Sequence, residues 1–341
     1  MAGTPADELT GSRHNFTTPD SRGHAPKRTP VRGKRVLVTG SAGFIGRHLA
    51  RELAMRGAKV QGLDREAQPG ADWPSFSLDI MSGDLETLNL GRMDYVFHLA
   101  AVTGVVRASS DPVKTLHVNY DGTARILALA KILGAKRFCL LSSSEVYGES
   151  PLQPLTEDQP LRPRSAYAQA KVLAEALLER SVNDEFTAVV VRPFNVYGLG
   201  QNEEFVVPRF VSAALTGRPL CVAGDGTQVR TFTHITDFIQ GTIAAMELSR
   251  KQFDIFNIAG SETMSIAQLA DTINQAAGGF SERHHLSLDD FARPAAIEIH
   301  TRIASIEKAE KMLDYHPKVG LREGLAKVIS DLRDGSAKDA A

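Results

Sequence analysis

The chain has 341 residues, of which 43% are apolar, and its 39 basic residues nearly balance its 40 acidic residues. A chain of this length can bury a sizeable core in one large domain or in two fused lobes. The balanced charge offers no field of one sign to nucleic acid or to an anionic membrane, and no apolar run is long enough to span a bilayer. Cys139 and Cys221 provide neither a disulfide framework nor metal-ligand spacing, so we expect a cytoplasmic protein without a metal site.

The two ends of the chain differ in composition from what lies between them. Residues 1–32 are polar, basic and rich in Pro, Gly, Thr and Arg, and they lack the apolar stretch of a secretory signal. This composition predicts a disordered N-terminal extension. Residues 333–341 predict a flexible tail.

The first predicted element combines a strand, a glycine-rich turn and a helix. An apolar strand over 35–39 runs into Gly40, Gly43 and Gly46, and a helical pattern follows over 43–56. Glycines let the backbone turn tightly and approach phosphates, while the helix N-terminus offers unpaired N–H groups and the positive end of its dipole. This order predicts a site for a dinucleotide pyrophosphate; a tight turn without a ligand is the alternative.

Strand and helix patterns alternate along the first two thirds of the chain. Strands are predicted over 35–39, 59–63, 95–99, 137–141 and 188–191, with helices over 43–56, 113–133 and 166–180. The alternation predicts an α/β fold with a doubly wound parallel sheet of the Rossmann type.

The pattern loosens after residue 198, and it predicts a smaller mixed α/β lobe. Strands are expected over 220–222 and 255–258, and helices over 207–215, 237–248, 266–277 and 305–313. We therefore expect a dinucleotide-binding domain over 33–198, completed by later segments such as 230–260, and a mainly substrate-binding lobe over 199–332. Ligands of open α/β sheets lie outside the carboxyl ends of the strands, where this lobe would cover them.

An acidic residue ends the second predicted strand. Asp64 lies 18 residues after Gly46, about the distance at which a carboxylate meets the adenosine ribose hydroxyls. A carboxylate there would repel the additional phosphate of NADP, which favours NAD, although Arg65 follows directly. A cap at the strand end is the alternative role for Asp64.

Hydroxyl groups and a lysine form a second constellation. A strand over 137–141 leads into three serines at 142–144, and Tyr167 and Lys171 follow, four residues apart on a predicted helix. An ammonium beside a phenol favours phenolate, so Tyr167 would act as a base on a substrate hydroxyl that a serine also binds. An amphipathic helix face is the alternative reading of the pair.

Together these segments resemble the extended short-chain dehydrogenases/reductases of the nucleotide-sugar epimerase/dehydratase family. The resemblance extends from Lys34 to about Leu332. Its motifs are Thr39-Gly40-x-x-Gly43-Phe44-Ile45-Gly46, His98-Leu99-Ala100-Ala101, Asn119-x-x-Gly122-Thr123, Ser143-x-x-Val146-Tyr147-Gly148, Tyr167-x-x-x-Lys171, Arg192-Pro193-x-Asn195-Val196-Tyr197-Gly198 and Arg230-Thr231-Phe232.

The resemblance implies roles at matching positions. The catalytic groups would be Ser143, Tyr167 and Lys171, with Glu145 beside them. NAD would be held by Gly40, Gly43, Phe44, Ile45, Gly46, Asp64, Asp79, Ile80, Leu99, Ala100, Ala101, Asn119, Tyr167, Lys171 and Phe194. The nucleotide-sugar substrate would be held by Ser143, Ser144, Asn195, Arg230 and Arg293. The family also pairs through two helices, which implies a homodimer through 113–133 and 166–180.

The resemblance implies hydride transfer at carbon 4 of the sugar, and it leaves the overall reaction open. We expect an NAD-dependent 4-epimerase of a nucleotide sugar, with a UDP-sugar as substrate. Glu145 favours a UDP-glucuronate decarboxylase or a 4,6-dehydratase as the alternative, although Ser144 replaces the acid that usually precedes it in dehydratases. A 4-ketoreductase ranks third, and an NAD-sensing binding protein is the reading that involves no catalysis.

Overall fold

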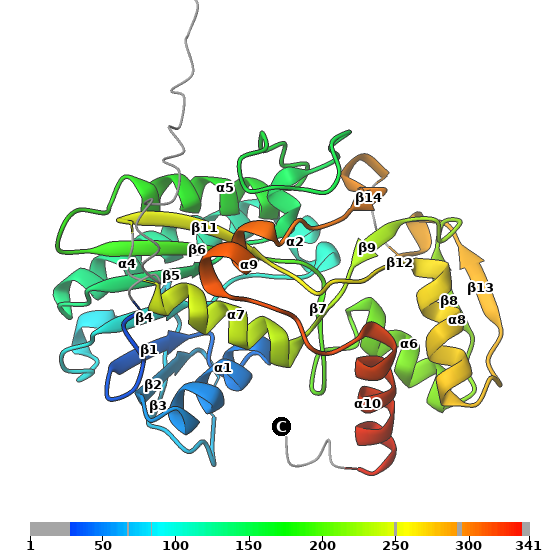
Figure 1. The fold of residues 1–341 in the computed structure, drawn as a ribbon, viewed down its shortest axis with the longest axis horizontal. Helices are drawn as coiled ribbons and strands as arrows, with labels where there is room; N and C mark the ends of the chain where they lie inside the picture. The colour runs from blue at the N-terminus through cyan, green and yellow to red at the C-terminus, as the bar shows by residue number, and fades with distance from the viewer. Residues whose placement is uncertain (1–27, 67, 83, 249–250, 292–294, 336–341) are drawn as a thin grey trace, which may run out of the picture.

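The computed structural model describes residues 28–66, 68–82, 84–248, 251–291 and 295–335 (Figure 1). Three predictions fall wholly or partly outside these residues. They are residues 1–27 of the extension predicted over 1–32, residues 336–341 of the tail predicted over 333–341, and Arg293.

A seven-stranded sheet forms the centre of the first domain. Every neighbouring pair of its strands is parallel, in the order β11-β6-β5-β4-β1-β2-β3. The strands are β1 (Arg35–Thr39), β2 (Lys59–Asp64), β3 (Ser75–Ser77), β4 (Tyr95–His98), β5 (Arg137–Leu141), β6 (Thr187–Pro193) and β11 (Phe253–Ile258). The predicted α/β class with a doubly wound parallel sheet is therefore confirmed.

Alternating side chains of the strands divide the core between two faces. Val36 and Val38 of β1 pack with α1 (Phe44–Met55), α7 (Ile235–Glu247) and α9 (Glu307–Leu313). Leu37 points to the other face, where the core includes side chains of α4 (Gly122–Ile132) and α5 (Ala166–Glu179). Period-two alternation thus places helices on both faces, as parallel sheets require.

The predicted helix over 113–133 is one continuous region with three parts. It consists of α3 (Pro112–Leu116), a π-helical turn (His117–Asp121) and α4, and it follows the short α2 (Val105–Ser110). The π turn carries Asn119, whose amide accepts from Val102 N at 2.7 Å and donates to Val102 O at 3.0 Å. The widened turn therefore anchors the chain that leaves β4.

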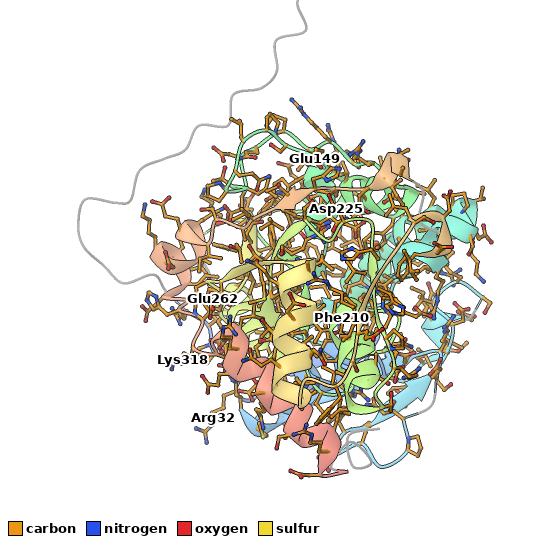
Figure 2. The ribbon with its side chains drawn as sticks, turned by 90° about the vertical axis from the view of Figure 1, so that its right-hand side faces the viewer. Arg32, Glu149, Phe210, Asp225, Glu262 and Lys318 are labelled. Carbon is orange, nitrogen blue, oxygen red and sulfur yellow. The ribbon has the colours of Figure 1, made fainter. Side chains whose placement is uncertain are left out.

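The second lobe has its own core between small sheets and three helices. Its strands are β8 (Leu220–Ala223) with β13 (Arg283–Leu286), and β9 (Val229–Thr231) between β12 (Thr263–Ser265) and β14 (Thr301–Arg302). Figure 2 looks onto the helices α6 (Val206–Leu215), α8 (Ile266–Ala277) and α10 (Leu321–Arg333), with Phe210 of α6 fully buried. The pair β7 (Val196–Tyr197) and β10 (Thr233–His234) lies where the chain passes between the lobes. No helix among the residues described has the length and apolarity needed to cross a bilayer.

Residues 28–32 correct the predicted boundary of the disordered extension. Val31 is 1% exposed within the core beside α7, and its N–H donates to Glu247 Oε1 at 2.9 Å. Thr29 N donates to Glu247 O at 2.8 Å, and Arg28 forms an isolated bridge with Leu248. Residues 28–32 are therefore fixed by the burial of Val31 and by hydrogen bonds to Glu247. The composition of the segment does not indicate these long-range contacts.

Candidate active site

The glycine turn after β1 fits a ligand that approaches the backbone closely. Gly40 has φ +73°, and a Cβ added there would lie 2.7 Å from Ala100 N. A Cβ on Gly46 would overlap the carbonyl oxygen of Gly40. No side chain caps α1 at Gly43, so the first N–H groups of the helix point to the turn without a side-chain acceptor. This cradle has the shape and polarity that a dinucleotide pyrophosphate requires.

Residues predicted to bind the cofactor follow the carboxyl ends of several strands of the central sheet. Asp64 ends β2, and its Oδ2 accepts from Ala42 N in the glycine turn at 3.0 Å. Leu99, Ala100 and Ala101 are partly exposed just after β4. Phe44 and Ile45 begin α1, Ile80 is buried, Asp79 is exposed and Phe194 is fully buried after β6.

The segment after β5 brings one of the three serines to the phenol. Ser143 caps a short 3-10 turn (Ser144–Tyr147) by accepting from Glu145 N at 3.1 Å, and its hydroxyl acts to lower the pKa of the Tyr167 phenol, against a larger effect of burial. Ser142 instead donates to Glu175, and Ser144 is 2% exposed. The structure therefore distinguishes Ser143 from its two neighbours.

Tyr167 and Lys171 lie one turn apart on α5, as their spacing predicted. Lys171 Nζ donates to Leu141 O at 2.8 Å and lies 5.9 Å from the centroid of the Tyr167 ring. Burial lowers the pKa of Lys171 to about 8, against a smaller opposing effect of Glu175.

The predicted low pKa of Tyr167 does not follow from the protein groups around it. Burial and the Glu145 carboxylate raise the pKa of the phenol above its ordinary value, and the hydrogen bond with Ser143 and the charge of Arg302 lower it less. Lys171 donates to a backbone carbonyl, which explains why it does not offset the cost of burial.

Arg302 is a residue of this site that the sequence analysis missed. Its Nη1 lies 3.6 Å from Glu145 Oε1, and its Nη2 donates to Asn195 Oδ1 at 2.9 Å. The side chains of Arg302 and Glu145 are 11% and 26% exposed. Arg302 belongs to β14 of the second lobe, so both lobes contribute side chains to the site. No motif marked it.

Two residues predicted to hold the diphosphate have extensive protein contacts. Asn195, at φ 36°, donates from Nδ2 to Thr231 O at 2.7 Å while it accepts from Arg302. Arg230 is 5% exposed; it donates to His300 O at 2.9 Å, to Ile299 O and to Glu298 Oε1 at 3.4 Å. A diphosphate would have to compete with these contacts of Arg230.

A buried polar network lies behind the phenol and the lysine. Arg192 of β6 forms two bonds with Glu175, at 3.1 and 2.6 Å, and donates to the Tyr147 hydroxyl at 2.8 Å. Tyr147 in turn donates to Asn257 Oδ1 at 2.7 Å. Glu175 is four residues after Lys171, a helical spacing that could have revealed it.

Fold and site together define the class: a dinucleotide-dependent enzyme with a Ser-Tyr-Lys group at the carboxyl edge of a parallel sheet. Residues 36–259 match the profile of the NAD dependent epimerase/dehydratase family, and the chain belongs to this family. The family resemblance seen in the sequence motifs and the NAD cofactor expected from them are therefore confirmed.

Curated relatives and solved structures of similar proteins divide between two reactions. The chain is 33% identical to UDP-N-acetyl-alpha-D-glucosaminuronate decarboxylase of Bacillus cytotoxicus, over 88% of this chain and 98% of that protein. It is 32% identical to UDP-glucuronic acid decarboxylase 1 of Arabidopsis thaliana, over 88% of this chain and 70% of that protein. A structure of UDP-glucuronic acid 4-epimerase from Bacillus cereus, with UDP-glucuronic acid and NAD, superposes with a TM-score of 0.78, at 30% identity over 88% of this chain and 99% of that one.

Proposed function

We propose that this enzyme decarboxylates a UDP-linked uronic acid. The observation that carries the proposal is the Glu145–Arg302 pair beside Tyr167, with 3.6 Å between the charged groups. A carboxylate at this place serves chemistry at carbon 5, which epimerisation at carbon 4 does not need. The relatives named above as decarboxylases also support it.

The chain's own groups divide the chemistry among them. NAD, held at the glycine turn, would supply the acceptor for a hydride from carbon 4 and the donor that restores it. Tyr167 accepts the proton of the 4-hydroxyl, which leaves a ketone two carbons from the C6 carboxylate. The bond between carbons 5 and 6 then breaks, carbon dioxide leaves, and the electron pair enters the enolate. Overall the reaction consumes one proton and releases one carbon dioxide.

Glu145 is the group that we assign to proton delivery at carbon 5 of the enolate. Its carboxyl raises the pKa of Tyr167, so the two groups are close enough to act on one sugar. Arg302 brings guanidinium N–H groups to the same place, and it would balance the negative charge of the uronic acid. Ser144 beside Glu145 is a poor general acid, which disfavours dehydration, because dehydration requires an acid to expel a hydroxyl.

The remaining site residues keep the roles that the family resemblance implies. We propose the glycine turn for the pyrophosphate, Asp64 for the ribose, and Asp79 with Ile80 for the adenine. Leu99, Ala100, Ala101 and Phe194 would line the cleft, supported by Asn119, and Asn195, Arg230 and Arg293 would act on the substrate diphosphate. We also propose a homodimer through α3, α4 and α5, on which Val113 and Leu173 are 77% and 47% exposed.

A UDP-sugar 4-epimerase is the second candidate, and it was the first expectation from the sequence. The similarity to the Bacillus cereus 4-epimerase structure favours it. We rank it second because it assigns no task to Glu145.

Product analysis tests the two candidates directly. Purified protein with NAD is incubated with UDP-glucuronate, UDP-N-acetylglucosaminuronate, UDP-glucose or UDP-N-acetylglucosamine, and the products are identified by NMR. A UDP-pentose with release of carbon dioxide is expected. An inverted carbon 4 with carbon 6 retained would instead support the epimerase.

A variant pair tests the role of Glu145. Glu145→Gln is expected to slow formation of the UDP-pentose by about 10²–10⁴-fold, the usual contribution of a general acid, because protonation of carbon 5 follows the loss of carbon dioxide. Glu179→Gln, at the exposed far end of α5, is the matched control and should keep full activity. Unchanged formation of the UDP-pentose by Glu145→Gln would remove the basis of the assignment.

A further inference from the structure

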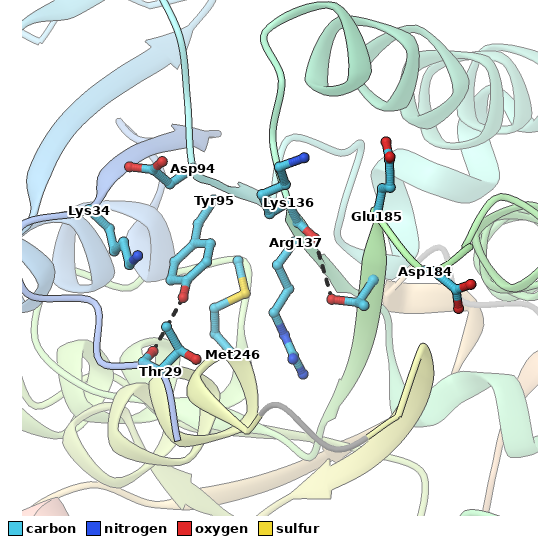
Figure 3. Close-up of a pocket in the computed structure, with 10 residues that line it drawn as sticks. Thr29, Lys34, Asp94, Tyr95, Lys136, Arg137, Asp184, Glu185 and Met246 are labelled. Atoms are coloured by element: carbon cyan, nitrogen blue, oxygen red, sulfur yellow. Dashed lines mark hydrogen bonds between the residues drawn. The ribbon is translucent and has the colours of Figure 1, made fainter. Parts of the chain in front are cut away.

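A cavity lies at the edge of the sheet opposite the active site. It has a volume of about 480 Å³. The residues that line it include those at the amino ends of β4, β5 and β6, and Lys34, which precedes β1. Figure 3 shows the Arg137 side chain extending between Tyr95 and Met246 on one side and the strand of β6 on the other. Catalytic groups lie at the carboxyl ends of the same strands, so the cavity is separate from the active site.

Arg137 is buried in this cavity with few partners. It is 6% exposed, and one hydrogen bond, from Nη2 to Ala245 O at 3.3 Å, is its recorded polar contact among the residues described. Its Nε has no partner in that part of the chain. A guanidinium carries five N–H donors in a rigid planar fork, so most of the donors of Arg137 are unused. Leaving a charged group buried and poorly paired is costly unless a ligand compensates it.

The acidic residues at the cavity do not supply that compensation. Asp94 accepts from Arg35 N at 2.8 Å, and Asp184 accepts from Gln252 Nε2 at 2.6 Å. Glu185 is exposed, and in Figure 3 all three carboxylates point away from the Arg137 guanidinium.

Two other charged groups lie near Arg137. Asp254 acts on Arg137 electrostatically; its Oδ1 accepts from Lys308 Nζ at 2.5 Å, and its Oδ2 has no hydrogen-bond partner among the residues described. Lys34 Nζ lies over the Tyr95 ring at 5.8 Å from the centroid, which adds a second positive charge to the cavity.

We propose that this cavity is a binding site for a compact oxyanion, a phosphate or a carboxylate, held by the guanidinium of Arg137 with Lys34 and Lys136 nearby. The planar fork of arginine matches two oxygens of either anion. The volume admits a small metabolite that carries such a group, and it exceeds what a free phosphate needs. The site is independent of the decarboxylation proposed above, because it lies at the other edge of the sheet.

Calorimetric titration with inorganic phosphate tests the proposal, with malonate as a carboxylate probe in a parallel titration. Both are performed at constant ionic strength with saturating NAD and UDP, so that anion binding at the active site is suppressed. Arg137→Met is compared with the natural protein, and Arg180→Met, at the exposed arginine that directly follows α5, is the matched control. Because any residual binding at the active site is common to all three proteins, the difference between them reports the cavity.

We expect Arg137→Met to bind the anion at least about tenfold more weakly, as loss of charge-assisted hydrogen bonds implies, while Arg180→Met binds as the natural protein does. Binding of phosphate alone assigns a phosphate ligand, binding of malonate alone a carboxylate, and binding of both supports the oxyanion site. Equal binding in all three proteins, or no binding of either anion, would overturn the proposal.

A crystal structure grown in phosphate provides a test that needs no variant. The anion is expected within hydrogen-bond distance of a terminal guanidinium nitrogen of Arg137, since Nε itself is buried. An empty cavity at saturating phosphate contradicts the proposal. Density there without a loss of affinity in Arg137→Met, or in Arg137→Lys if the methionine variant does not fold, would mean an adventitious ion only.

Discussion

Two buried arginines on neighbouring strands, at opposite edges of the central sheet, have contrasting surroundings. Arg192, at the carboxyl end of β6, is 1% exposed and bonds to Glu175 and to the Tyr147 hydroxyl. Arg137, at the amino end of β5, is 6% exposed and makes one hydrogen bond within the described part of the chain. Burial lowers the pKa of both, but Glu175 more than reverses this effect for Arg192, whereas the pKa of Arg137 stays below its ordinary value.

We interpret Arg192 as a structural charge and Arg137 as a charge that is available to a ligand. The Arg192 network joins α5, which carries Lys171, to Ser142 in the segment after β5 and to Asn257 of β11. A buried polar network stabilises the fold only when each of its polar groups has a hydrogen-bond partner. Arg137 belongs to no network of this kind, which is why we interpret its cavity as a binding site.

The largest effect is expected at the carboxyl edge, where a protein group touches the substrate. Tyr167→Phe removes the phenolic hydroxyl and should lower turnover by about 10²–10⁴-fold, the range for a general base. NAD content, measured from the absorbance of the denatured protein, should be unchanged because the glycine turn is intact. Near-normal turnover of this variant would contradict the assignment of the base.

Substituting each arginine by methionine compares the two edges directly. Arg192→Met leaves the Glu175 carboxylate buried without its partner and should lower the free energy of unfolding by about 3–5 kcal/mol. Arg137→Met replaces a poorly paired cation with an apolar chain and should change it by about 1 kcal/mol or less in phosphate-free buffer. Urea unfolding measures both. Similar losses in the two variants would remove the contrast.

His98 makes the carboxyl edge sensitive to acid. It lies between the Thr39 and Thr123 hydroxyls, at 2.7 and 3.1 Å, and burial lowers its pKa to about 3. The unfolded chain therefore binds a proton below pH about 6.5 that the folded chain refuses, so stability falls as the pH falls, by up to about 1.4 kcal/mol per pH unit. His98→Gln should lack this slope between pH 6.5 and 5. Parallel stability curves for the two proteins would contradict the neutral, buried imidazole.

Lys171 acts over a narrower range of alkaline pH. Its pKa of about 8 lies below the ordinary value of 10.5, so between these values the unfolded chain holds a proton that the folded chain has released. Stability should therefore rise from pH 8 to about 10, by up to about 1.4 kcal/mol per pH unit, relative to Lys171→Met. Thermal unfolding across this range measures the difference, and a falling relative curve would show that the lysine is charged when folded.

Local patterns predicted much of the fold. The strands over 35–39 and 137–141 in the first domain and the helix over 266–277 in the second lobe have the bounds that period and turn residues indicated. The π turn at Asn119 was not predicted, because it depends on bonds to Val102 that helical periodicity cannot show. The structured conformation of residues 28–32 was also not predicted, because it depends on contacts with Glu247 far along the chain.

The candidate site likewise contains residues that local patterns predicted and one that they did not. Tyr167 and Lys171 lie four residues apart, so their proximity follows from helical spacing, and Ser143 was identified by its motif. Arg302 meets Glu145 and Asn195 from 157 and 107 residues away, a contact that depends on the path of the second lobe. Sequence reasoning chose Arg230 and Arg293 as the second-lobe arginines instead, and Arg293 lies outside the residues that the structure describes.

The interleaving of the lobes limits how this protein can be dissected. Helix α7 and strand β11 follow β9 and β10 in the chain, yet both belong to the sheet domain, and α9 returns to it after β14. A fragment that stops at residue 198 would expose β6 as a bare hydrophobic edge and uncover one face of the sheet. Such a fragment is expected to self-associate through that strand, so residues up to 198 should not form an autonomous folding unit.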